Sequence, residues 1–259
     1  MPYRKIPENV GHKTIEILEG FGKTVTLGFE AVKGILNGKV NVKLTVEQMV
    51  KIGVDSLPLT LVTASFIGMV FALQIAGEFV KFGAGKFVGG VMAIGIAREL
   101  GPAVTGIVIS ARVSAAVSAE IGTMQVKEQI DALRALGANP IRYLVIPRFI
   151  AAAAMLPLLT ILANVVGFGG GYIVATFFGN INPVQYLETA QRLLKLWDVY
   201  GGLLKTLIFG MVISIIACYK GLNTKGGAKG VGDATTSSVV TSLISLFILN
   251  YFLSILFFK

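Results

Sequence analysis

Cysteine, histidine and charged side chains are scarce in this 259-residue chain, and each scarcity excludes a class of site. The single cysteine, Cys218, has no partner for a disulfide within one chain and cannot build a Cys-based metal framework. The single histidine, His12, excludes a histidine-rich metal site or catalytic triad. Only 14% of the residues are charged, whereas a soluble domain has about 25%. The composition therefore predicts a membrane protein without a resident metal.

The chain also lacks the motifs of an enzyme that uses ATP. GxxxxGK[ST] is absent, so the chain cannot itself hold ATP in a P-loop, and we expect no cofactor in it. The glycine-rich run at 226–232 has neither a preceding strand nor a Ser/Thr-capped helix after it, so it is interpreted as a flexible loop. No catalytic constellation is present, and the chain is expected to be non-enzymatic.

Long apolar runs dominate what is present. Hydrophobic residues make up 54% of the chain, and the mean hydropathy is +0.76. Runs of bilayer length predict an all-α membrane protein with five transmembrane helices. The expected spans are residues 57–80, 87–119, 144–178, 203–219 and 239–258.

Residues 13–37 predict an amphipathic helix that is too charged to span a membrane. We expect it to lie on the membrane surface or to pack under the bundle. Its apolar positions recur at helical spacing and are Leu18, Phe21, Val25, Phe29, Val32 and Leu36.

A second amphipathic helix is expected between the second and third spans, over residues 123–137. Its apolar residues Val126, Ile130, Leu133 and Leu136 recur at steps of four, three and three. Lys127 and Asp131 form a predicted i,i+4 ion pair. Gly137 and Pro140 supply stop signals after it.

The net charge of +9 reflects topology and not nucleic-acid binding. No nucleic-acid motif interleaves the basic residues with aromatic ones. With the N-terminus inside, 15 Lys and Arg side chains fall in inner segments and five in outer ones. Because basic residues collect in cytoplasmic loops, this bias places helix 123–137 in the cytoplasm and Trp197 outside.

Four charged residues inside the second span are the sharpest functional signal: Arg98, Glu99, Arg112 and Glu120. A charge at the centre of a bilayer costs roughly 2.5–3.5 kcal/mol on insertion scales, so its default interpretation is functional. The alternative is structural: Arg98 could extend to the outer interface, Arg112 could pair within the bundle, and Glu120 could cap the inner end.

Three motifs give the chain a recognisable signature: ARELGP at 97–102, SAEIGTMxVxEQIDAL at 118–133 and LGxxPxxYLVxPR at 136–148. They closely resemble the MlaE family, the permeases of bacterial ABC systems that move phospholipid between the inner and outer membranes. The resemblance covers roughly residues 45–259, which divides the chain into an N-terminal interfacial region, 1–45, and a permease domain, 46–259.

The resemblance implies a homodimer with five spans per subunit in the bacterial inner membrane. It also implies a cytoplasmic ABC ATPase (MlaF-like) that carries ATP and Mg²⁺, and often a small STAS-domain partner (MlaB-like). A periplasmic ring of an MCE-domain protein (MlaD-like, hexameric) is implied as well. The substrate is expected to be phospholipid, so the implied process is lipid transport that maintains the lipid composition of the outer membrane.

The same resemblance assigns roles to individual residues. The helix between spans two and three is the family's coupling helix for the ATPase, and the family's lipid pocket lies between subunits on the periplasmic side. The implied lipid-binding residues are Phe71, Gln74, Ile75, Phe79, Phe82, Arg98 and Glu99. The implied coupling residues are Thr123, Lys127, Ile130, Asp131, Leu133, Arg134, Leu136 and Gly137.

Two other functions remain open from the residues alone. A proton-coupled secondary transporter of an amphipathic substrate would use Glu99 or Glu120 as its proton carrier, but the capped surface helix does not favour it. A membrane anchor without a pathway would leave the charges inside the second span unexplained.

Overall fold

The computed structural model describes residues 5–38 and 40–259, with side chains from residue 18 onward and of Ile15. Residues 1–4 and 39 of the expected N-terminal region lie outside this description. The predicted all-α class is confirmed, and five helices are long and apolar enough to cross a membrane. These candidate spans are Val42–Lys81, Gly85–Val126, Ile141–Phe177, Leu196–Leu222 and Gly227–Phe258.

Short irregular turns divide several of these spans into shorter elements. In chain order the elements are α1 (Lys5–Leu36), α2 (Val42–Ile52), η1 (Val54–Ser56), α3 (Leu57–Lys81), η2 (Gly85–Phe87), α4 (Val88–Gly95), η3 (Ile96–Leu100), α5 (Gly101–Val126), α6 (Gln129–Ala135), η4 (Ile141–Val145), α7 (Ile146–Phe177), α8 (Pro183–Leu193), α9 (Leu196–Leu222) and α10 (Gly227–Phe258).

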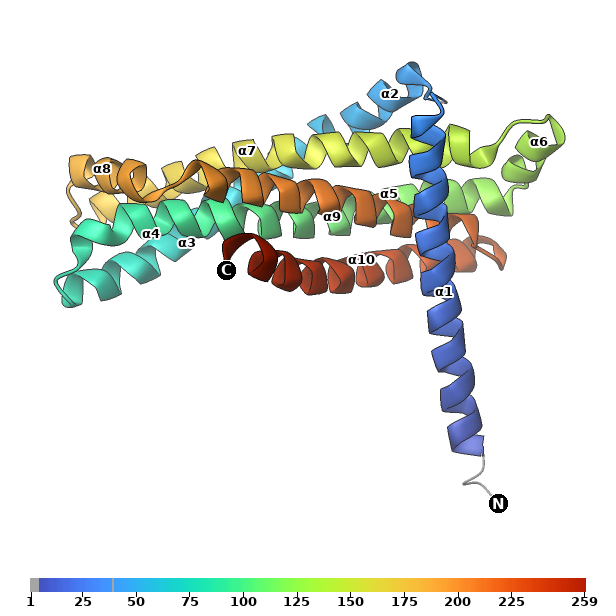
Figure 1. The fold of residues 1–259 in the computed structure, drawn as a ribbon, viewed down its shortest axis with the longest axis horizontal. Coiled ribbons are helices and arrows are strands. Elements are labelled where there is room, and N and C mark those ends of the chain that lie inside the picture. Colours follow the sequence, from blue (N-terminus) through green and yellow to red (C-terminus); the bar gives the residue numbers. More distant parts are fainter. Residues whose placement is uncertain (1–4, 39) are drawn as a thin grey trace.

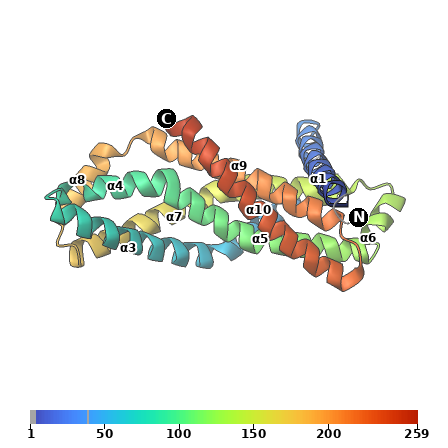
Figure 2. The ribbon, with the colours of Figure 1, turned by 90° about the horizontal axis from the view of Figure 1, so that it is seen from below.

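The spans run side by side as an elongated bundle, and α1 crosses it almost at right angles (Figure 1). The turn of α6 projects from the end of the bundle that α1 crosses, and α8 covers the opposite end. Figure 2 shows the bundle from a second side, with α3 and α7 along one flank and α10 lying across α5 and α9. If the spans cross a bilayer, α1 therefore lies in the plane of the membrane.

Two faces of α1 have different environments. Leu27 and Ala31 are buried in the bundle core. A Cβ added at Gly34 would overlap the Ile146 side chain, so the helix touches the start of α7 closely there. The predicted apolar stripe lies on the other side and is exposed, from 40% at Val25 to 81% at Leu36. One face of α1 thus packs on the bundle, and its apolar stripe is free to enter the bilayer.

The fourth and fifth spans are longer than predicted. Helix α9 begins at Leu196, so Trp197 lies on a helix and not in a loop. Helix α10 begins at Gly227, so most of the glycine-rich run at 226–232, interpreted from the sequence as a flexible loop, is helical. Glycine, serine and threonine in the first turns of α10 have weak helix propensity, but their small size allows tight packing. Ser114 of α5 donates to Ser242 of α10 at 2.9 Å, and Ser238 is fully buried.

The predicted continuous helix over 123–137 is also wrong in its bounds. Helix α5 continues to Val126, the chain turns at Glu128, which has a left-handed φ of 57°, and α6 then runs only from Gln129 to Ala135. Lys127 therefore lies on a different element from Asp131, and their predicted pair is replaced by an ion pair between Arg134 and Asp131 at 2.6 Å. The stop signal at Gly137 is confirmed, since its φ is +76°.

Close contact between α3 and α7 depends on glycine. A Cβ on Gly68 would overlap the backbone carbonyl of Gly167, so any side chain at position 68 forces the two helices apart. Small residues at such crossings are how membrane helices approach without a hydrophobic driving force. Gly77, further along α3, has nothing within 4 Å of its Cβ position.

We predict opposite effects for alanine at these two glycines. Gly68→Ala should destabilise the fold by about 1–3 kcal/mol, because the contacted atoms are backbone. Gly77→Ala should be neutral or stabilise by up to about 1 kcal/mol, since alanine is the better helix former. Apparent Tm in detergent at a fixed scan rate measures both. Equal Tm values for the two variants would contradict this account of the α3–α7 contact.

Candidate functional site

Arg98 and Glu99 lie in η3, a π-helical turn in the middle of the second span. Pro102 explains the turn, because a proline has no N–H and its ring would clash with the carbonyl four residues earlier, here that of Arg98. The chain avoids the clash by widening: the N–H of Gly101 donates to Ile96, five residues back. Pro102 is therefore preceded by a π turn that leaves the Arg98 carbonyl available to another donor.

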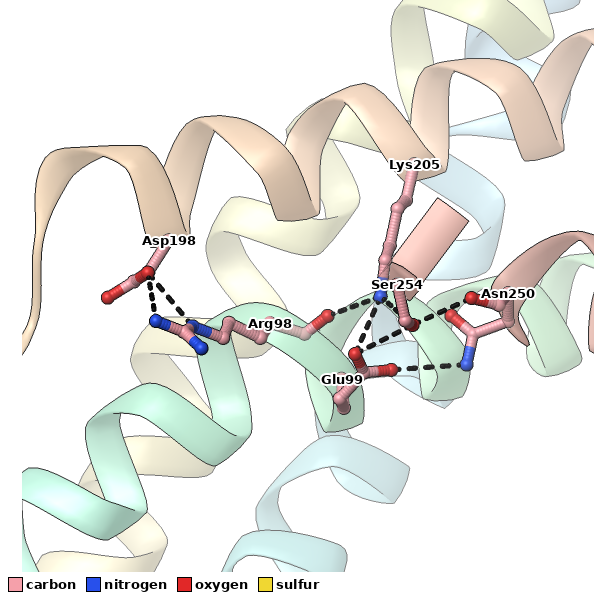
Figure 3. Close-up of polar contacts among 6 residues, drawn as sticks. All are labelled: Arg98, Glu99, Asp198, Lys205, Asn250 and Ser254. Carbon is pink, nitrogen blue, oxygen red and sulfur yellow. Dashed lines mark hydrogen bonds and ion pairs between the residues drawn. The ribbon is translucent and has the colours of Figure 1, made fainter. Parts of the chain in front are cut away.

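That donor is Lys205 of α9, whose side chain is fully buried. Its ammonium donates to the Arg98 carbonyl at 2.9 Å, to Glu99 Oε1 at 2.8 Å and to Ser254 Oγ at 2.7 Å (Figure 3). A lysine ammonium has three N–H donors and no acceptor. All three donors are satisfied here, so a buried cation is tolerated inside an apolar bundle.

Arg98 makes a second, separate pair with Asp198, one residue after Trp197 on α9. Its Nε and Nη2 lie 2.9 and 2.7 Å from the same carboxylate oxygen, Oδ1 (Figure 3). The other oxygen, Oδ2, accepts from the backbone N–H of Lys195 at 2.9 Å and so caps the start of α9. The Asp198 side chain is 1% exposed, and a charge-assisted pair of this geometry holds it there.

The last turns of α10 close the network. Asn250 donates to Glu99 Oε2 at 3.2 Å, and Ser254 Oγ lies 2.8 Å from Glu99 Oε1. The ring of Phe258 lies 4.9 Å from the Arg98 guanidinium carbon and 5.0 Å from Lys205 Nζ, within cation–π range of both. We call Arg98, Glu99, Asp198, Lys205, Asn250 and Ser254 the polar network.

The network is paired but only partly enclosed. Its two cations and two anions balance, and Lys205 and Asp198 are buried. Arg98 and Glu99 are 32% and 42% exposed at their side chains. Among the hydrogen bonds of the described residues, none uses the third guanidinium nitrogen of Arg98, Nη1. The open side therefore presents one free cationic donor and one carboxylate at the surface of the subunit.

Close approach of α9 to η3 again requires glycine. A Cβ on Gly202 would overlap the carbonyl of Ala97, which directly precedes Arg98. Without this contact, Lys205 and Asp198 could not both reach the π turn.

The other two charges of the second span are used within the fold, near α6. Arg112 donates to Ser56 Oγ at 2.6 Å and to the Lys51 carbonyl at 3.1 Å, which ties α5 to the junction of α2 and α3. Glu120 pairs with Arg148 at 2.9 Å, and Arg148 is only 4% exposed. For Arg112, the structural alternative of pairing within the bundle describes what is seen, whereas Glu120 forms an ion pair with Arg148 instead of capping the inner end.

The predicted lipid-binding residues of α3 are not gathered around Arg98 within one subunit. Phe71, Ile75 and Phe79 pack half-buried against a cluster formed by α3, α4, α7 and α8. Gln74 and Phe82 are exposed, Phe82 to 82%. Arg98 instead points to α9. A shared site for these residues would need a surface outside the single chain.

The predicted coupling residues divide into one anchor and an exposed surface. Ile130 is fully buried in the main core, so it attaches α6 to the bundle and offers no area to a partner. Leu133 is half-buried and Leu136 is 82% exposed. The remaining predicted positions are exposed: Thr123, Lys127, Asp131, Arg134 and Gly137.

Four members of the network were not predicted from the sequence: Asp198, Lys205, Asn250 and Ser254. A usable signal existed, since Asp198 and Lys205 are seven residues apart, two helical turns, and thus share a face of α9. Two opposite charges on one face of a span complement the adjacent Arg98 and Glu99. In the described part of the chain, no group of three or more His, Cys, Asp or Glu side chains could hold a metal ion.

Comparison with known proteins shows the family to which the chain belongs. The sequence model described as Permease MlaE matches residues 45–256, more than four-fifths of the chain. The chain belongs to the MlaE permease family.

Relatives of this MlaE permease carry consistent names. A probable ABC transporter permease protein of Synechocystis is 50% identical over 225 residues, 87% of this chain and 86% of the relative. A probable ABC transporter permease protein of Rickettsia felis is 41% identical over 98% of both chains. The chloroplastic protein TRIGALACTOSYLDIACYLGLYCEROL 1 of Arabidopsis thaliana is 42% identical over 89% of this chain and 66% of its own.

The MlaE permease is therefore a multi-pass membrane protein and the permease subunit of a transporter. The names of its relatives as ABC transporter permeases imply an ATPase partner. The motif ARELGP, which resembles the family, is the segment that builds the π turn and supplies two network residues.

We predict that the Lys205–Glu99 pair is coupled in stability. Lys205→Met leaves the Glu99 carboxylate without its cation and should cost about 3 kcal/mol, or roughly 6–12 °C in apparent Tm. Lys205→Met combined with Glu99→Gln removes both charges and should recover at least half of that loss. A double variant as unstable as Lys205→Met alone would show that the pair is not the source of the effect.

Proposed function

We propose that this chain is the permease subunit of an ABC transporter that moves phospholipid between the inner and outer bacterial membranes. In this proposal it is a multi-pass protein of the inner membrane, acts as a homodimer and binds lipid at the dimer interface. The observation that carries the proposal is the half-open polar network, which holds a cationic donor at the edge of an apolar bundle.

The chemistry of the network suits a phospholipid. A phosphate diester needs charge-assisted N–H donors, and a guanidinium provides them in a planar fork. The free Nη1 of Arg98 can donate to a phosphate oxygen while Nε and Nη2 stay on Asp198. Acyl tails need apolar walls, which Phe71, Ile75 and Phe79 of α3 would supply from a facing subunit or from the same subunit after rearrangement.

Exposure of Glu99 supports a dimer. A carboxylate that is 42% exposed on the side of a bundle would face hydrocarbon if lipid tails surrounded a single subunit, and charge in that environment is costly. A second copy would enclose the network in a chamber that admits water and headgroups. The Arabidopsis relative is named after a galactolipid, which is consistent with a lipid substrate.

Charge bias gives the orientation that we propose. Basic residues are concentrated at the α6 end, which is therefore cytoplasmic, and α8 faces the periplasm. The ATPase would dock on α6 and supply ATP and Mg²⁺. An MCE-domain protein would receive or deliver lipid at the α8 end, and a STAS-domain protein would bind the ATPase.

The lipid site is tested by neutralising the Arg98 pair without breaking it. Arg98→Gln combined with Asp198→Asn keeps a hydrogen-bonded pair but removes the cation. Phospholipid co-purified with the assembled protein should fall at least about fivefold, since hydrogen bonds to a charged group contribute about 1.5–3 kcal/mol. The measurement is lipid per subunit by mass spectrometry, together with transport in proteoliposomes.

Asp198→Asn alone is the matched control, because it leaves Arg98 charged and frees its guanidinium. This variant should keep or increase its bound phospholipid. Normal lipid content and transport in the double variant would place the site elsewhere. Transport by the purified chain without any ATPase would favour the proton-coupled alternative.

The coupling assignment is tested at Leu136, the most exposed apolar residue of the segment. Leu136→Asp should reduce ATPase co-purification at least about tenfold, since a carboxylate buried without a partner costs several kcal/mol. Its effect on the Tm of the isolated chain should be small, because the side chain is already exposed. Leu136→Met is the conservative control and should retain binding. Full ATPase recovery with Leu136→Asp would exclude this surface as the dock.

A further inference from the structure

A groove of about 620 Å³ lies between the end of α1 and the segment that joins α6 to α7. None of the proposed lipid-binding residues lines it. Among the predicted coupling residues, only Gly137, which has no side chain, forms part of its wall. The groove walls carry Lys33 from α1, Asn37 directly after α1, Asn41 before α2, and Asn139, Arg142 and Tyr143 from the connecting segment. The groove is thus built where two segments distant in sequence, residues 30–41 and 137–146, meet at one end of the bundle (Figure 1).

The charged side chains of the groove are mainly cationic. Lys33 and Arg142 are exposed, and neither lies within an ion-pair distance of any carboxylate among the described side chains. Glu30 is the single acid in the lining. The lining therefore has two cations against one anion, and the cations are not used by the fold.

The asparagines add donors of the same kind. Asn139 Oδ1 accepts from the backbone N–H of Ile141 at 2.9 Å, and Asn41 Oδ1 accepts from that of Leu44 at 3.3 Å. Each oxygen is occupied by the backbone, which leaves each NH₂ group as the available end. A site with two free cations and amide NH₂ groups matches an anion with several acceptor oxygens.

The depth of the groove in the membrane follows from its neighbours. Helix α1 runs across the bundle, and its exposed apolar stripe, including Phe29 at 72% and Leu36 at 81%, fits the boundary between headgroups and tails. Arg142 and Tyr143 begin the third span, which starts at Ile141. A groove flanked by these two elements lies at headgroup level, and Ile141 and Ile146 in its wall can meet the first carbons of a tail.

We propose that this groove binds the phosphate headgroup of an anionic phospholipid from the leaflet at the α6 end. The phosphate is held by Lys33 and Arg142, and the amide groups of Asn41 and Asn139 donate to its remaining oxygens. Glu30 in the lining opposes a second negative charge, so a singly charged headgroup fits better than a polyanion. This lipid stays in the groove and is distinct from the lipid that is transported.

Binding of an anionic lipid in the groove would make the α6 end of the bundle respond to the lipid composition of the membrane. Lys33 belongs to α1, whereas Arg142 follows α6 by only a few residues, and Gly137 and Ala138 form part of the groove wall. A headgroup bound to both cations joins α1 to the segment directly behind α6. Anionic lipid should therefore stabilise the arrangement that presents α6.

The test uses the full chain, purified in detergent and then mixed with phosphatidylglycerol or phosphatidylcholine. Phosphatidylglycerol should raise the apparent Tm of the wild type, and phosphatidylcholine should have little effect. Lys33→Gln combined with Arg142→Gln should weaken the phosphatidylglycerol effect about tenfold or more in half-saturating concentration, because two charge-assisted bonds are lost. Lys33→Arg combined with Arg142→Lys should keep most of it.

The matched control is Lys225→Gln combined with Lys229→Gln, which removes two exposed positive charges from the same end of the bundle but outside the groove. This variant should respond to phosphatidylglycerol like the wild type. An equal loss in the control would show a general charge effect and overturn the site. Protection by inorganic phosphate equal to that of phosphatidylglycerol would overturn the lipid as its occupant. Failure of the transport proposal would change neither outcome, because the readout is lipid-dependent stability.

Discussion

The buried ammonium of Lys205 is the interaction on which the contact between the second, fourth and fifth spans depends. A lysine in mid-span costs roughly 2.5–3.5 kcal/mol on insertion scales, unless its donors are satisfied. Here the three acceptors come from two other spans: the Arg98 carbonyl and the Glu99 carboxylate from the second, and the Ser254 hydroxyl from the fifth. One cation thereby fixes the mutual positions of three spans. The carbonyl is free only because Pro102 interrupts the helix ladder, so a backbone defect in one helix is satisfied by a side chain of another.

Polar residues serve different purposes at the two ends of the bundle. Near α6, Arg112 and the Glu120–Arg148 pair join helices to each other and to the junction of α2 and α3. Near α8, the Arg98 and Glu99 side chains are paired but remain partly open to the outside of the subunit. Structural ion pairs gain nothing from exposure to a bilayer. The open network is therefore the stronger candidate for contact with a charged headgroup.

Helix α1 and the α6 segment give the chain two surfaces outside the spans, and both depend on anchors in the core. Leu27 and Ala31 hold α1 against the bundle, and Ile130 does the same for α6. With the anchors buried, the remaining faces are free for other contacts: the stripe of α1 for the bilayer, and Leu136 with its polar neighbours for a protein partner. The groove between these segments joins the two surfaces.

Local pattern was sufficient for the class of the fold and for the positions of its elements. Five apolar runs of bilayer length, the amphipathic period of α1 and the stop at Gly137 are properties of neighbouring residues, and the structure has a helix at each run. The motif ARELGP, through its resemblance to a family, also indicated that Arg98 and Glu99 occupy a functional position. Helix bounds were less well predicted at 196–203 and 227–238. At 227–238, packing of small residues between α5 and α10 overrides their weak helix propensity. At 196–203, the Asp198 carboxylate caps the start of α9 by accepting from the backbone N–H of Lys195.

The sequence could not predict which side chains pair with each other across the bundle. Nothing local distinguishes Arg98 as a ligand of Asp198, one hundred residues away, from Arg98 as a free donor to lipid. Likewise, period alone placed Ile130 and Leu136 on one stripe, although the turn at Glu128 and the contact with the core bury the first and expose the second. Pairing and burial depend on which helices are adjacent, and adjacency is set by glycine contacts such as Gly68–Gly167 and Gly202–Ala97. The sequence by itself determined the helices and the charges they carry. Only the tertiary structure decided which charges are paired and which remain open to other ligands. The reason is that Coulombic and hydrogen-bond energies depend on distances between segments, and the order of residues along the chain does not specify those distances.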